Sequence, residues 1–113
     1  MKLIIAIIQP HRLEEVKKAL YAADVNLITV SEVLGHGREK SIDEYYRGMK
    51  ESGNLLRKIR LEIAVNENFV EATIKAIVKG GKTGQVGDGK VFVLDLERCV
   101  RIRTGEEGNE AIG

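Results

Sequence analysis

The 113 residues correspond to one domain of ordinary size, and 18 basic residues against 17 acidic ones exclude a strong overall attraction to nucleic acid or to an anionic membrane. The only cysteine, Cys99, excludes an intrachain disulfide and a multi-cysteine zinc site, and it favours a cytoplasmic location. No apolar run approaches the ~20 residues of a membrane-spanning helix, so no direct membrane insertion is expected.

The first third of the chain has the pattern strand, helix, strand. Residues 3–8 are apolar and largely β-branched and stop before Pro10, which predicts a buried strand. Over residues 12–23, apolar side chains recur at three- and four-residue steps with charged ones between them, as in an amphipathic helix. Residues 26–33 return to β-branched side chains, and this second strand should end near Gly35.

A long exposed loop is predicted for residues 37–56, which are rich in charge and lack a steady period. Loops of this length in a compact domain are commonly functional. Residues 58–65 then alternate between apolar and polar side chains, as in a third strand. Residues 67–79 have helical spacing, with Asn66 as the expected N-cap and Gly80 and Gly81 as the expected stop.

The last part of the chain adds a fourth strand, residues 90–94, and a strand-like stretch, residues 100–103. The polar residues 104–113 form a tail that is either mobile or docked elsewhere. The order of elements predicts one α+β domain, residues 1–113, with the ferredoxin-like βαββαβ arrangement. Helices would cover one face of its sheet, so the other face would be covered most simply by further copies of the chain.

The glycine-rich loop at residues 82–90 is the strongest sign of a binding site. Its glycines let backbone N–H groups turn toward an anion, and Lys90 adds a positive charge. Gly84 to Lys90 fits the front of a Walker A loop, but Val91 stands where the magnesium-binding hydroxyl belongs, and the loop runs from helix to strand. This pattern favours phosphate binding without P-loop hydrolysis, and a plain glycine turn is the alternative.

Two further patterns could contact an anion. Arg101 and Arg103 lie two residues apart on the strand-like stretch, so they would share one face and could grip phosphate, unless this is a solvated edge. Residues 35–38, Gly-His-Gly-Arg, form a second glycine–arginine turn. His36 and His11 are too far apart in the sequence to predict a metal site and are expected to be solvated.

Five segments together resemble the PII nitrogen regulatory signal-transduction proteins. They are Thr29–Arg38, Tyr46–Gly48, Lys58–Ile63, Thr83–Val93 and Arg101–Glu107. The resemblance runs over the whole chain, and the glycine-rich loop and the Arg-Ile-Arg-Thr-Gly-Glu-Glu stretch are its most specific parts.

The resemblance implies a homotrimer of ferredoxin-like subunits that binds ATP or ADP, with Mg²⁺ accompanying ATP, in clefts between neighbours. It implies that residues 37–56 are the T-loop, which acts on an ammonium transporter or a nitrogen-assimilation enzyme. Carried over by position, the nucleotide-binding residues are Gly87, Asp88, Gly89 and Lys90 of one subunit, Arg101 and Arg103 of its neighbour, and Thr29, Gly35, Gly37 and Arg38 lining the same cleft.

Two positions depart from the family pattern. Glu51 stands where many members carry a uridylylated tyrosine, so that modification has no acceptor there, although Ser52 is adjacent. Glu39 stands where members that bind 2-oxoglutarate have a glutamine near the metal, while Lys58, which holds the effector's far carboxylate in that family, is present. Nucleotide sensing is therefore expected, and 2-oxoglutarate sensing should be weakened.

Two other classes of function compete with a regulator. A slow ATPase could use Glu62 and Lys90 at the same cleft. An RNA-binding ferredoxin-like module would stack bases on aromatic side chains of the sheet, for which the fourth strand offers only Phe92. We therefore expect a regulatory protein that does not bind nucleic acid and is not an enzyme.

Overall fold

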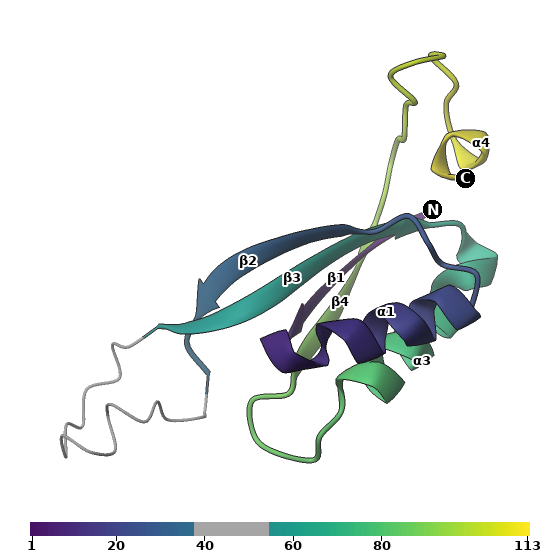
Figure 1. Ribbon diagram of the computed structural model, residues 1–113. Coiled ribbons are helices and arrows are strands. Elements are labelled where there is room, and N and C mark those ends of the chain that lie inside the picture. The colour runs from purple at the N-terminus through teal and green to yellow at the C-terminus, as the bar shows by residue number, and fades with distance from the viewer. Residues whose placement is uncertain (38–54) are drawn as a thin grey trace, which may run out of the picture.

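The computed structural model describes residues 1–37 and 55–113 as an α+β unit built on one antiparallel sheet (Figure 1). The four strands are β1 Lys2–Ile8, β2 Thr29–Gly35, β3 Leu56–Val65 and β4 Gly89–Asp95. They lie in the order β2-β3-β1-β4, with each neighbouring pair antiparallel. This is the order of a ferredoxin-like fold, so the predicted βαββαβ arrangement is confirmed. The residues expected to form the T-loop lie largely outside the described ranges.

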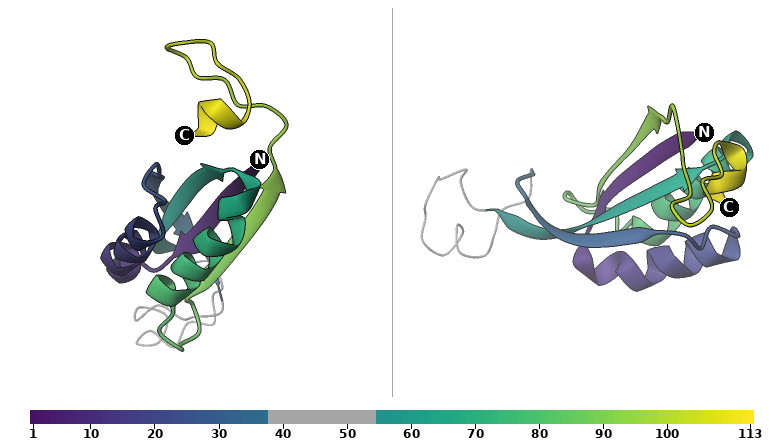
Figure 2. Two further views of the ribbon diagram at one scale, coloured as in Figure 1. Left: turned by 90° about the vertical axis from the view of Figure 1, so that its right-hand side faces the viewer. Right: turned by 90° about the horizontal axis from the view of Figure 1, so that it is seen from above.

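Two helices pack side by side on one face of this sheet (Figure 2). Helix α1, Leu13–Ala22, follows a short 3₁₀ turn and turns Val16 and Leu20, four residues apart, into the core. Helix α3, Val70–Gly81, also follows a 3₁₀ turn and buries Ala76 and Ile77. These side chains meet alternate residues of β1 and β3, so the hydrophobic core lies between the helices and this face of the sheet.

The second helix ends two residues later than predicted, because it continues through both glycines that were expected to end it. A Cβ atom on Gly80 would lie only 2.6 Å from Cα of Val16, so the absence of a side chain lets the two helices touch. Arg12, in the 3₁₀ turn before α1, also donates from Nε to the Gly80 carbonyl at 2.9 Å. Tertiary packing thus outweighs the usual tendency of glycine to end a helix.

The other face of the sheet has no helix over it in the described part of the chain. The register sets Ile5 between Glu62 of β3 and Phe92 of β4, and it sets Leu3 between Ala64 and Leu94. Phe92 is 48% exposed and Leu94 45% exposed. As predicted, the face combines apolar β1 and β4 with small or charged side chains from β3.

The prediction of a strand-like stretch at residues 100–103 is wrong. Val100 forms a single bridge with Glu107, and the chain between them turns back on itself, with the Gly105 N–H donating to the Arg101 carbonyl at 2.8 Å. Four alternating residues are too few to outweigh the turn that follows them, and the stretch has no neighbouring strand in the sheet.

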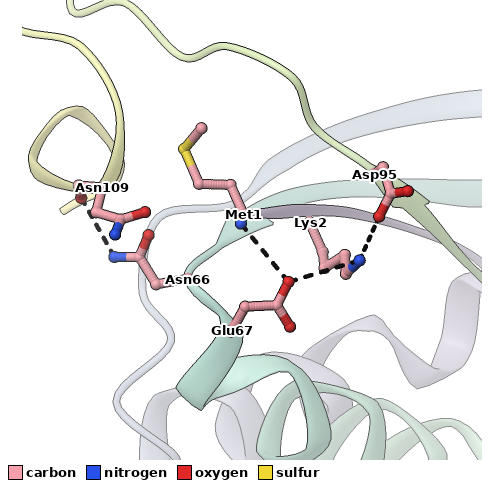
Figure 3. A network of polar contacts seen from close by, with 6 residues as sticks. All are labelled: Met1, Lys2, Asn66, Glu67, Asp95 and Asn109. Carbon is pink, nitrogen blue, oxygen red and sulfur yellow. Dashed lines mark hydrogen bonds and ion pairs between the residues drawn. The ribbon is translucent and has the colours of Figure 1, made fainter.

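The tail at residues 104–113 is docked, which was one of the two predicted alternatives. It ends in the short helix α4, Asn109–Ile112, and Asn66 donates from its side-chain nitrogen to the Asn109 carbonyl at 3.2 Å (Figure 3). Asn66 occupies the predicted N-cap position, before the 3₁₀ turn Glu67–Phe69, but its side chain makes no capping hydrogen bond there. Beside it, Glu67 lies 3.5 Å from the Lys2 ammonium, which also pairs with Asp95.

Candidate functional site

A cleft of about 550 Å³ opens where β2 ends and β4 begins. It is lined by Ile7, Gly35, His36, Gly37, Lys58, Val86, Gly87, Gly89, Lys90 and Phe92. The glycine-rich loop and the glycine–arginine turn, which are some fifty residues apart in the sequence, therefore meet at one end of the sheet. His36, which was expected to be merely solvated, is exposed but lines this cleft.

The glycine-rich loop is held by Asp88, whose carboxylate accepts bonds from the chain just before it. The donors are the backbone N–H groups of Thr83, at 2.8 Å, and of Gly84, at 3.0 Å, together with the Thr83 hydroxyl. The Thr83 hydroxyl, with the two N–H groups, lowers the pKa of Asp88 below its ordinary value, so the carboxylate is ionised at neutral pH. Its ionised form is the one that shapes the loop.

At Gly89 the loop passes into β4 at a point where only glycine fits. Its φ is +106°, and a Cβ atom there would lie 1.7 Å from the carbonyl oxygen of Ile7. The close approach sets β4 directly against β1, with Lys90 opposite Ile7. The position of Lys90 at the cleft is therefore fixed by backbone contact.

Two lysines give the cleft its charge. Lys90 is exposed at the start of β4, whereas Lys58 is only 6% exposed and donates from Nζ to the Gly87 carbonyl at 3.3 Å. No carboxylate stands among the described residues that line this cleft. Two cations, backbone N–H groups and several glycines make a site suited to an anion.

Some predicted site residues lie elsewhere. Thr29 and Gly35 are at opposite ends of β2, about 20 Å apart at the usual rise of a strand. Arg101 and Arg103 follow the far end of β4 from Gly89, so they lie at the opposite end of the sheet from the cleft (Figure 1). Single-chain geometry thus separates the predicted residues into two groups.

Arg38, Glu39, Glu51 and Ser52 all lie outside the described residues.

The two arginines differ in their surroundings, although the sequence predicted that they share one face of a strand. Arg101 donates from Nη1 to the Glu106 carboxylate at 2.8 Å and from Nη2 to the main-chain oxygens of Glu110, at 3.0 Å, and Gly113, at 2.8 Å. Arg103 is exposed and has no polar partner within the described ranges. Sequence reasoning missed Glu106 as a partner of Arg101. The feature that could have revealed it is Gly105, which marks a turn between the two residues.

The alternative enzyme site finds little support in the geometry of one chain. Glu62 lies on the open face of the sheet, 3.1 Å from Arg60 Nε, and it is not part of the cleft lining. Within residues 1–37 and 55–113, no three or more His, Cys, Asp or Glu side chains gather as a metal site would require. None of the helices there is long and apolar enough to cross a membrane.

Comparison with known proteins gives a consistent result over nearly the full chain. The family model described as nitrogen regulatory protein P-II matches residues 1–106. The nitrogen regulatory protein GlnK1 of Methanosarcina mazei is 53% identical, covering 99% of this chain and 97% of its own. The nitrogen regulatory protein P-II of Rhizobium etli is 46% identical, covering 99% of this chain and all of its own.

A solved structure agrees with these relatives. The crystal structure of Arabidopsis thaliana PII bound to citrate is 33% identical and superposes with a TM-score of 0.80, covering 98% of this chain and 88% of the other.

Proposed function

Since this chain belongs to the nitrogen regulatory protein P-II family, we propose that it senses nitrogen status by binding ATP or ADP in clefts between subunits of a homotrimer. It passes the signal on through residues 37–56, acting as the T-loop on an ammonium transporter or a nitrogen-assimilation enzyme. The observation that carries the proposal is the cleft at the glycine-rich loop. Lys58 and Lys90 line it, and no carboxylate does so among the residues that the structure describes.

The division of the site into two groups supports binding between copies. Arg101 and Arg103 are too far along the chain from Gly89 to reach the cleft of their own subunit, because β4 lies between them. A neighbouring copy can supply them, and it can supply Thr29 in the same way. The open face, with Phe92 and Leu94 nearly half exposed, gives such copies an apolar surface on which to pack.

The chemistry of the cleft fits a nucleotide's phosphates. The backbone N–H groups from Gly87 to Gly89 and the Lys90 ammonium are the donors offered by one copy, and the arginines of the neighbour complete them. Asp88 serves by holding the loop, and what it offers a phosphate is its backbone N–H. Gly35 and Gly37 line the same cleft, and Arg38 follows them in the sequence.

Arginine variants test the nucleotide site directly. Because a hydrogen bond from a charged donor contributes about 1.5–3 kcal/mol, Arg103→Ala should weaken ATP binding roughly ten- to a hundredfold by calorimetry. Arg98→Ala is the matched control, since it removes the same charge from the same segment, where Arg98 pairs with Glu107 at 2.6 Å. Absence of ATP binding by the parent, or equal losses in the two variants, would contradict this site.

Assembly is tested on the same samples. Light scattering at micromolar concentration should give the mass of three chains, as the proposed homotrimer requires. An interface stable at that concentration buries roughly 800 Å² on each partner. A monomer mass would contradict the shared cleft.

Glu39 bears on the effector that accompanies ATP. Its carboxylate can bind Mg²⁺, but it also brings a negative charge toward the incoming carboxylates of 2-oxoglutarate, where the family's glutamine brings none. Like charges ~4 Å apart repel by roughly 4 kcal/mol at an effective dielectric constant of 20, before the metal screens them. We therefore expect 2-oxoglutarate to bind more tightly to Glu39→Gln than to the parent in saturating Mg-ATP, and equal binding would show that the metal cancels the repulsion.

The proposed role is regulatory, and the relatives matched are named regulatory proteins. Glu51 gives the T-loop no uridylylation acceptor at that position. A cytoplasmic location is part of this proposal and agrees with the single cysteine.

A further inference from the structure

Arg101 is the residue around which the last part of the chain is folded. Its guanidinium makes three hydrogen bonds, all of them to residues between Glu106 and Gly113. Its backbone belongs to the same structure, since the Arg101 N–H donates to the Glu106 carbonyl at 2.8 Å. In this arrangement the tail satisfies the arginine that the proposed nucleotide site also requires.

The pattern of these bonds decides what else Arg101 can hold. A guanidinium grips a phosphate with two parallel N–H groups, either Nη1 with Nη2 or Nε with Nη2. Both pairings use a hydrogen on Nη2, which has two. These two hydrogens are donated to the main-chain oxygens of Glu110 and Gly113, so the docked tail leaves Arg101 without a two-pronged grip.

We propose that residues 106–113 are an intramolecular competitor for the phosphate-binding guanidinium of Arg101, so that nucleotide binding and release of the tail are coupled. The inference rests on the proposed nucleotide site and adds a second ligand to it, supplied by the chain itself. Arg103, exposed and without such partners, makes the first contact with the phosphates. Arg101 binds the phosphates once α4 has been released.

The tail is held by contacts that can open without disturbing the core. Beyond the bonds to Arg101, its described polar anchors include the single bond from Asn66 to Asn109 and the exposed ion pair of Glu107 with Arg98. Glu106 is 39% exposed, so its bond to Arg101 is partly screened by water. Such a segment has the low local stability expected of a part that moves on binding.

Adjacent glutamates allow a matched test by calorimetry with ATP on the full chain. Glu106→Gln weakens the tail's hold on Arg101, and we expect it to tighten ATP binding about three- to tenfold, since a bond to a charged acceptor is replaced by a weaker one. Glu107→Gln removes the same charge one residue away and breaks the tail's exposed ion pair with Arg98, but it leaves the three bonds to the Arg101 guanidinium in place. It therefore controls for the general gain in attraction when a negative charge is lost, and it should change ATP affinity less than twofold.

Hydrogen exchange supplies the second readout. Saturating ATP should speed exchange of the Ala111 N–H, bonded to the Gly108 carbonyl at 3.0 Å, and of the neighbouring tail amides, while amides of β1 stay protected. Equal affinities of the two glutamine variants, with tail protection unchanged by bound ATP, would overturn the competition and leave the nucleotide site standing. Failure of the parent to bind ATP at all would overturn both.

Discussion

The two faces of the sheet are made from the same strands, yet one copy of the chain completes only one of them. On the face covered by α1 and α3, Ile4 and Ile63 have no exposed surface. On the opposite face, Ile5 is half-buried and its neighbour Phe92 is 48% exposed. Within its seven residues, strand β1 thus has one side buried in the core and one side that is only partly buried.

The difference shows where the binding chemistry is found. The covered face holds apolar side chains and gives the fold its stability, since hydrophobic burial is the main favourable term in folding. The open face ends at the cleft, because Ile7, Lys58, Lys90 and Phe92 belong to its rows and also line that cleft. A surface left for other copies of the chain is therefore continuous with the proposed nucleotide site.

Adjacent isoleucines on β1 offer the most direct way to break this comparison. Ile4→Ala should lower the free energy of unfolding by about 2–5 kcal/mol, because it leaves a cavity in a core that is already closed. Ile5→Ala should cost about 1 kcal/mol in a dissociated chain, where the side chain keeps part of its contact with water. Urea unfolding followed by circular dichroism measures both values.

Protein concentration separates the two faces further. If the open face packs against other copies, the cost of Ile5→Ala should grow with concentration, because assembly stabilises the folded state by mass action. The cost of Ile4→Ala should change little over the same range. Identical concentration dependence for the two variants would mean that both faces are closed, or left open, in the same way.

Much of the covered face could be predicted from the sequence, because periodicity reports burial inside one chain. The alternation that begins at residue 58 and the helical spacing of residues 12–23 each reflect one side facing the core, and those elements were placed within a few residues. The run through Gly80 could not be predicted, since it depends on contact with Val16, far away in the sequence.

The candidate site was predictable only in part, and for a related reason. The composition of the glycine-rich loop indicated an anion site, and the structure forms a cleft there with Lys90. The alternation at residues 100–103 misled, because a pattern of four residues cannot report that Arg101 is tied to Glu106. The resemblance assigned Thr29 and Gly35 to one cleft, but within one chain they lie at opposite ends of β2.

An effect smaller than that of Ile4→Ala is expected at the end of the open face, where β4 begins. Gly89→Ala would place a methyl group against the Ile7 carbonyl at a positive φ, whereas Gly84→Ala has a similar φ of +88° and no atom within 4 Å of the new methyl group. The backbone strain is therefore shared, at about 1 kcal/mol for each variant. Only Gly89→Ala must also push β4 away from β1, for a total of about 2–3 kcal/mol.

Thermal unfolding measures that difference, and ATP calorimetry shows whether it reaches the site. Lys90 follows Gly89 directly, so displacement of β4 should also move Lys90. We therefore expect Gly89→Ala to weaken ATP binding several-fold more than Gly84→Ala does, although both residues lie in the glycine-rich loop. Equal losses of stability would show that β4 yields freely at its first residue. In that case contact with Ile7 would not be what fixes Lys90, and the cleft would be shaped by its ligand instead of by the edge of the sheet.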